Sequence, residues 1–176
     1  MQGASMFALT RILVPTNLGE PSKAAVRYGV AFARQFGAKL YLLHVLDAKQ
    51  FEAAIETERV LETLGSDGPP PAAGASDLTE VARNAAREDL GKLLTTQEEH
   101  DTQAEYLLRP ARAGSGDAIV ACAEELGVQL VVMGKHRLGF VEHLVAGSVA
   151  EKVIRRAPCP VLIVHYPEHE FVRDET

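Results

Sequence analysis

Glycine, serine and cationic residues gather in the last third of the 176-residue chain, in an order suited to holding an anion. Gly134 follows a buried-type apolar run, and positions 135–137 are lysine, histidine and arginine. Gly147 and Ser148 stand at the start of a helical pattern, where free backbone N–H groups and the positive end of the helix dipole attract anions. These two segments predict a phosphate cradle with a strand end as one wall and a helix start as the other.

The same residues also have ordinary structural explanations. Gly134 can be a turn glycine, Ser148 a helix N-cap, and the neighbouring cations solvated charges on a surface loop. The residue types by themselves leave a phosphate site and a purely structural role equally open.

The sequence contains little that indicates a catalytic residue. The sequence has neither the GxSxG turn of serine hydrolases nor the GxxxxGK[ST] phosphate loop. His44 lies inside an apolar run and is predicted to be a packed or hydrogen-bonded histidine. Asp117 follows a glycine in a position typical of a helix cap. Cys122 and Cys159 lack a partner motif and are predicted to be small core residues.

The elements that must position these residues alternate between apolar runs and amphipathic segments. Continuous apolar runs are typical of strands buried on both faces of a parallel sheet. Their alternation with helical patterns that stop at glycine, as at Gly37 and Gly127, predicts right-handed crossovers. The predicted strands are 11–15, 40–45, 105–109, 129–133 and 161–164; the predicted helices are 21–36, 77–99, 117–126 and 147–156; and 134–147 is predicted to be a loop.

The first predicted helix has apolar residues at a spacing of three and four, which indicates one buried face. These residues are Ala25, Tyr28, Gly29, Phe32 and Phe36. Segment 77–99 has a similar pattern and is predicted to be a single amphipathic helix. A loop rich in proline and glycine at 65–76 precedes it.

Composition excludes several classes of protein. A net charge of −6 disfavours general binding to nucleic acid or to anionic membranes. No apolar run approaches the roughly 18 residues of a membrane span, and the first nine residues lack the basic start of a secretory signal. We therefore expect a cytoplasmic protein with no nucleic-acid or membrane partner.

Both ends of the sequence resemble the universal stress proteins. Nucleotide-binding members of that family carry Gly, two residues, Gly, nine residues, and then Gly-Ser or Gly-Thr. Gly134, position 137 and Gly147-Ser148 have this spacing. The resemblance spans about residues 10–165, and its further matches are 12–16, 20–22, 36–40, 44–45, 147–153 and 156–164.

Two positions depart from the family pattern. Arg137 stands where the motif has its second glycine, so that its side chain either crowds the phosphates or binds them through its guanidinium. Gly139 is positioned to restore flexibility. Asn17 stands where the family usually has an aspartate, which keeps the capacity to hydrogen-bond and removes the charge.

The resemblance implies an α/β fold with an open five-stranded parallel sheet of order 3-2-1-4-5 and helices on both faces. It divides the chain into an N-terminal extension (1–9), a universal stress protein domain (10–166) and a C-terminal tail (167–176). It also implies a homodimer through the last strand, which includes Val161, Leu162, Ile163 and Val164. An apolar strand at a sheet edge is usually paired or covered, which favours the same interface.

The function implied is binding of ATP or AMP in stress response or signalling, with little or no turnover and with Mg²⁺ dependence left open. Two alternatives remain, namely a stress-family dimer that acts through protein partners without ATP, and a slow ATPase. No catalytic or metal-binding residue is predicted. The predicted nucleotide-binding residues are Pro15, Thr16, Asn17, Val45, Met133, Gly134, Lys135, His136, Arg137, Gly139, Gly147, Ser148 and Val149.

Overall fold

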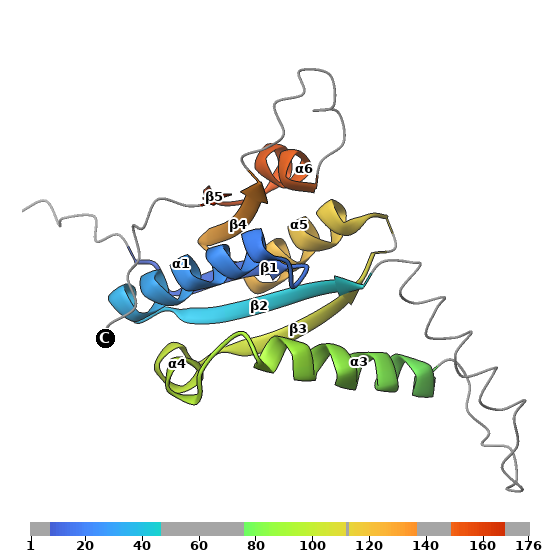
Figure 1. Cartoon of the computed structure of the whole chain (residues 1–176). Helices are drawn as coiled ribbons and strands as arrows, with labels where there is room; N and C mark the ends of the chain where they lie inside the picture. The colour runs from blue at the N-terminus through green and yellow to red at the C-terminus, as the bar shows by residue number, and fades with distance from the viewer. Residues whose placement is uncertain (1–7, 47–75, 112, 137–148, 168–176) are drawn as a thin grey trace, which may run out of the picture.

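The chain folds around an open parallel sheet, seen in a computed structural model that describes residues 8–46, 76–111, 113–136 and 149–167 (Figure 1). The five strands lie in the order β3-β2-β1-β4-β5, and each neighbouring pair is parallel. The predicted fold class and strand order are confirmed. The strands are β1 (Arg11–Thr16), β2 (Lys39–Leu46), β3 (Glu105–Pro110), β4 (Leu130–His136) and β5 (Val161–Tyr166).

Helices cover both faces of this sheet and give three layers (Figure 1). The described helices are α1 (Glu20–Phe36), α3 (Ser76–Gly91), α4 (Thr96–Thr102), α5 (Ser115–Leu126) and α6 (Val149–Arg156). The first three pack on one face, and α5 and α6 pack on the other. No helix in the described part of the chain is long and apolar enough to cross a membrane.

The central strands contribute side chains to two separate hydrophobic cores, one on each face of the sheet. This is because successive side chains of a strand point to opposite faces. Ile12 and Val132 face the α1 side, whereas Leu13 and Val131 face α5 and α6. All four side chains have no exposed surface. Burial on both faces explains why these strands are continuous apolar runs in the sequence.

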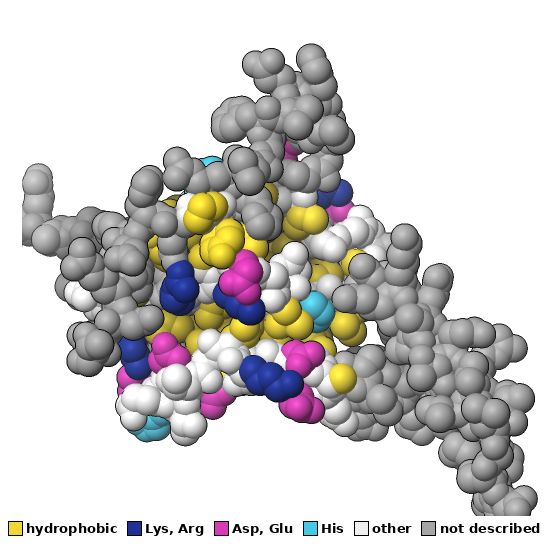
Figure 2. Space-filling view, viewed as in Figure 1, with side chains coloured by type: hydrophobic (Ala, Val, Ile, Leu, Met, Phe, Trp, Pro, Cys, Tyr) yellow, Lys and Arg dark blue, Asp and Glu magenta, His cyan; other side chains and the backbone are white. Residues whose placement is uncertain are grey.

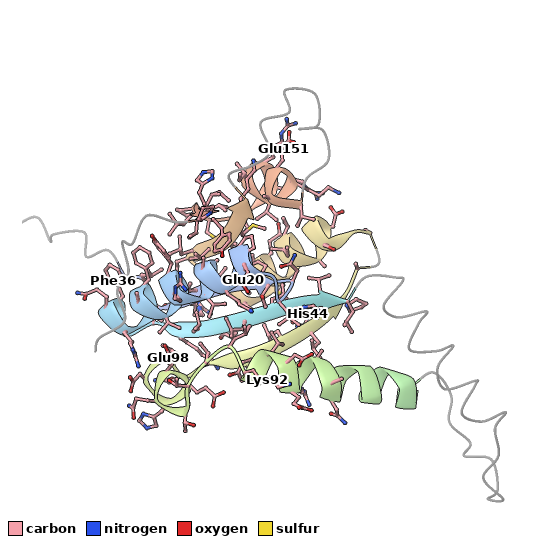
Figure 3. All side chains as sticks on the ribbon, in the orientation of Figure 1. Glu20, Phe36, His44, Lys92, Glu98 and Glu151 are labelled. Atoms are coloured by element: carbon pink, nitrogen blue, oxygen red, sulfur yellow. The ribbon has the colours of Figure 1, made fainter. Side chains whose placement is uncertain are left out.

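Helix α1 ends as predicted, at Gly37, whose φ of 64° is left-handed and whose N–H bonds the carbonyl of Ala33. Its predicted apolar face is partly wrong. Ala25 and Gly29 are buried, but Phe36 is 46% exposed at the end of the helix opposite Glu20 (Figure 3). Burial therefore ends before the apolar period does, since Ala33 in the same turn has no exposed surface.

The single helix predicted over 77–99 is wrong, because α3 ends at Gly91 and α4 begins at Thr96. Thr95 and Glu98 form a capping box: the Thr95 hydroxyl accepts the Glu98 N–H, and the Glu98 carboxylate accepts the Thr95 N–H at 2.7 Å. Leu90 and Leu94, on either side of the break, are both buried. Both leucines lie in the core on the α1 side of the sheet.

Strand β4 also runs further than predicted. Gly134, Lys135 and His136 belong to the strand and pair with residues 164–166 of β5, so their assignment to a loop is wrong. The rest of that predicted loop, the predicted loop at 65–76 up to residue 75, and the tail beyond residue 167 lie outside the described residues.

Charged side chains of both signs lie next to one another on the molecular surface (Figure 2). Lys23 bonds Glu20 at 2.7 Å one turn along α1, and Lys92 bonds Asp89 at 2.9 Å at the end of α3. All four side chains are exposed, so water screens these pairs and each contributes little to stability.

The close packing of α1 on β1 is tested by Gly29→Ala. The added Cβ would lie 2.5 Å from Cγ2 of Val14, which is itself buried. Overpacking costs about 1–3 kcal/mol, which outweighs the roughly 1 kcal/mol gained in helix propensity. We expect a net loss of up to about 2 kcal/mol in the free energy of unfolding, measured by urea denaturation. Gly91→Ala is the control, since its Cβ meets nothing within 4 Å. Equal stability of the two variants would contradict this packing.

Candidate functional site

The carboxyl ends of β1 and β4 lie side by side at the point where the strand order reverses. After β1 the chain continues to β2 on one side of this point, and after β4 it continues to β5 on the other. The connections diverge here and leave a crevice, which is where open α/β sheets bind ligands.

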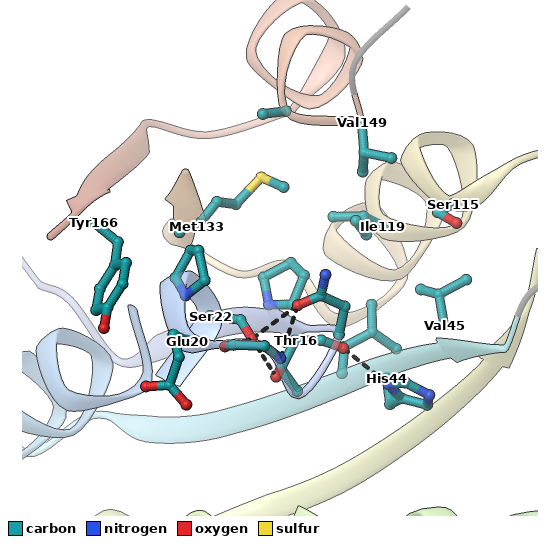
Figure 4. A pocket seen from close by; sticks show the side chains of 17 residues that line it. Thr16, Glu20, Ser22, His44, Val45, Ser115, Ile119, Met133, Val149 and Tyr166 are labelled. Carbon is teal, nitrogen blue, oxygen red and sulfur yellow. Dashed lines mark hydrogen bonds between the residues drawn. The ribbon is translucent and has the colours of Figure 1, made fainter. Parts of the chain in front are cut away.

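A pocket of about 550 Å³ occupies this crevice (Figure 4). Its volume lies within the range of small-molecule sites. The ends of β1, β2 and β4 contribute residues to its walls, as do the first turns of α1, α5 and α6. The predicted site residues that line it are Pro15, Thr16, Asn17, Val45, Met133, Gly134 and Val149.

The other predicted site residues divide into two groups. Lys135 is exposed and does not line the pocket, and His136 pairs with Tyr166 through its backbone while its side chain falls outside the description. Arg137, Gly139, Gly147 and Ser148 lie outside the described residues, so their role stays a prediction.

Several lining residues were not predicted. Glu20 and Ser22 come from the first turn of α1, Ser115 from the first turn of α5, and Tyr166 from the end of β5. His44 belongs with them: it is buried and hydrogen-bonded, as predicted, and it also reaches the pocket wall. Their shared signal in the sequence is a position at a helix start or at the carboxyl end of a strand.

A network of hydrogen bonds fixes the loop between β1 and α1. The Thr16 hydroxyl accepts the Leu18 N–H at 3.0 Å and donates to Ser22 Oγ at 2.9 Å. Asn17 Oδ1 accepts the Gly19 N–H at 3.1 Å. Leu18 has a φ of 64°, a left-handed conformation that costs a non-glycine residue about 1 kcal/mol or more. The surrounding bonds hold the loop in this conformation.

The end of β2 is tied to this loop through His44. Its Nδ1 lies 2.9 Å from the backbone carbonyl oxygen of Thr16 (Figure 4). Because a carbonyl oxygen only accepts, Nδ1 carries the proton of this bond. His44 is 6% exposed, so the bond is shielded from water and aligns the two strand ends that border the pocket.

Gly134 has a structural reason to be glycine. A Cβ placed on it would overlap the carbonyl group of Pro21, in the first turn of α1. Helix α1 therefore takes the space that a side chain at this position would fill. Gly134 still lines the pocket through its remaining surface.

Asp117 joins α5 to α6. It accepts from Lys152 at 2.7 Å and from Arg156 at 2.5 Å, and the hydrogen bond from Lys152 holds the pKa of its carboxyl group below the usual value. Its predicted role as a helix cap is wrong, since Gly114 occupies the N-cap of α5 without a side-chain bond. These ion pairs hold α6 against α5, and the first turn of α6 forms one wall of the pocket.

The fold and the pocket define a class: open α/β proteins with a pocket at the carboxyl edge of a parallel sheet. This chain belongs to the universal stress protein family, whose sequence model matches residues 8–165. The recognition made from the sequence is thereby confirmed.

Relatives and solved structures agree with this assignment. Universal stress protein MJ0531 of Methanocaldococcus jannaschii is 29% identical over 91% of this chain and 84% of its own length. A universal stress protein solved in complex with cAMP is 22% identical, with a TM-score of 0.55 over 90% of this chain and 98% of its own. The universal stress protein of Archaeoglobus fulgidus, solved in complex with dAMP, is 19% identical, with a TM-score of 0.55 over 89% of this chain and 98% of its own.

Removal of one hydroxyl tests the loop network. In Thr16→Val the volume and strand preference stay similar, but Leu18 N–H and Ser22 Oγ lose a partner beside a residue that is 5% exposed. We expect a loss of about 1–3 kcal/mol in the free energy of unfolding. The control Thr96→Val, on the exposed start of α4, should stay within about 0.5 kcal/mol of the wild type. Urea denaturation measures both, and an unchanged Thr16→Val would show that the network does not stabilise the loop.

Proposed function

We propose that this protein binds an adenine nucleotide in the pocket at the carboxyl edge of the sheet, as a stress-response or signalling protein with little or no turnover. The observation that carries the proposal is the meeting of three helix starts at one pocket. Residues from the first turns of α1, α5 and α6 all line it. Helix starts present free N–H groups and a positive dipole end, which suit a phosphate group.

The apolar part of the same pocket suits a base and a sugar. Val45, Ile119 and Met133 line it beside the polar loop that contains Asn17. Small-molecule sites usually combine apolar walls with a few placed polar groups in this way. The universal stress proteins solved with cAMP and dAMP support an adenine nucleotide as the ligand.

The proposal assigns a part of the ligand to each group of predicted residues. The adenine lies near Pro15, Thr16, Asn17 and Val45, and the phosphates lie near Gly134 and Val149. The predicted residues at positions 135–137, 139, 147 and 148 complete the phosphate side.

A pair of tryptophan substitutions on α6 tests nucleotide binding. Val149 lines the pocket and is 41% exposed, so a tryptophan there fills the binding space without entering the core. We expect Val149→Trp to weaken AMP binding more than about tenfold in isothermal titration calorimetry, because lost contacts and a blocked pocket cost over 1.4 kcal/mol.

Ile154→Trp is the matched control, since Ile154 lies on the same helix, is 54% exposed and does not line the pocket. It should bind AMP like the wild type. A wild-type protein that binds neither AMP nor ATP would contradict the proposal and favour a stress-family protein that acts through protein partners.

The homodimer is proposed to form through β5. This strand lies at the edge of the sheet, beside β4 alone, and Val161, Leu162 and Ile163 are only half-buried. An apolar edge strand is a template for pairing with a second copy.

A charge on this strand tests the interface. We expect Ile163→Lys to shift a dimer to a monomer in light scattering after gel filtration, because a lysine on an edge strand opposes pairing. Thr96→Lys, at an exposed position of α4 outside this strand, is the control. A monomeric wild type, or an Ile163→Lys variant that stays dimeric, would contradict this interface.

A further inference from the structure

We propose that Asn17 is a hydrogen-bond donor to the ligand and that this selects ligands with an acceptor atom at that place. The inference rests on the proposed function, because it concerns the same pocket. It goes further by stating which chemical group the ligand presents to the loop between β1 and α1. An exocyclic amine or a coordinated metal ion does not meet this requirement, because an amide nitrogen only donates.

The orientation of the Asn17 amide follows from its neighbours. The backbone N–H of Gly19 lies 3.1 Å from one terminal atom of the side chain, and a backbone N–H only donates. That terminal atom is therefore the oxygen. The hydroxyl of Ser22 lies 3.1 Å from the same atom.

The nitrogen of the amide points away from these partners. Within the described part of the chain, no hydrogen bond to Nδ2 of Asn17 is found, while Oδ1 has two neighbouring donors. Asn17 is exposed and lines the pocket. With the oxygen held by the loop, the two N–H groups of the amide are left for the pocket.

The fold itself has no need of an amide at this position. An aspartate would accept the Gly19 N–H through one oxygen in the same way, and its charge would lie close to the positive start of α1. The loop therefore tolerates either side chain. The difference between them falls on the second terminal atom, which is a donor in asparagine and a charged acceptor in aspartate.

Because the loop tolerates either side chain, the Asn17→Asp variant tests the contact with the ligand without disturbing the fold. The variant should be at least as stable as the wild type, and the Gly19 amide should keep its NMR chemical shift and its slow hydrogen exchange. Asn84→Asp, on the exposed surface of α3 and away from the pocket, adds the same charge and is the control. Asn17→Ser removes the amide donor without adding charge, and its hydroxyl can still accept the Gly19 N–H.

Binding of AMP and of adenosine is measured by calorimetry for all four proteins, in a buffer with a chelator. We expect Asn17→Asp to weaken AMP binding by at least about tenfold and Asn17→Ser by about fivefold, the range for a lost hydrogen bond with and without charge. Asn84→Asp should match the wild type. A loss for AMP alone places the acceptor on the phosphate, and a loss for both ligands places it on the nucleoside; both results support the inference.

Different binding results would overturn this inference and the proposed function. If the wild type binds AMP and both Asn17 variants bind it equally well or more tightly, Asn17 is not a donor to the ligand, and nucleotide binding still stands. If the wild type binds neither AMP nor adenosine, both proposals are overturned.

Discussion

The approach of α1 to the backbone of β4 is the constraint on which the rest of the site depends. The carbonyl of Pro21 occupies the space that a side chain on Gly134 would fill, so only glycine lets the two elements meet. This contact brings the start of α1 directly beside the point where the strand order reverses. The helix start therefore becomes a wall of the pocket instead of standing off from the sheet.

The loop that leads from β1 into α1 contains one strained residue. Leu18 adopts a left-handed conformation, and the side chains of Thr16, Asn17 and Ser22 bond the backbone or one another around it. On the opposite wall, Asp117 of α5 pairs with Lys152 and Arg156 of α6, and buried Val153 of α6 lies in the same core as Ile119 and Val120 of α5. Contacts within the protein therefore position both walls.

The sequence predicts the elements and their type well, because burial on two faces leaves a clear pattern in each strand. It predicts their ends less well. The last turn of α1 keeps its apolar period although Phe36 is exposed, and the capping box at Thr95 divides a helix whose pattern looks continuous. The site was predicted on β1, β2, β4 and α6, where the family resemblance applies. Ser115 and Tyr166 were missed because only the packing of α5 on the sheet and the pairing of β5 with β4 bring this helix start and this strand end to the pocket.

Residues around the pocket differ in what they reveal about a ligand. Gly134 is required by the packing of α1, and Thr16 by the loop, so both would be present in this fold whether or not a nucleotide binds. A match to the family motif at Gly134 is therefore evidence for the fold more than for the ligand. Val149 is different, because it is exposed in the pocket wall. The nitrogen of Asn17 is different too, because the loop bonds only the oxygen of that side chain. Substitutions at positions of this second kind are therefore the more direct tests of ligand binding, because they leave the packing of Gly134 and the hydrogen bonds of Thr16 intact.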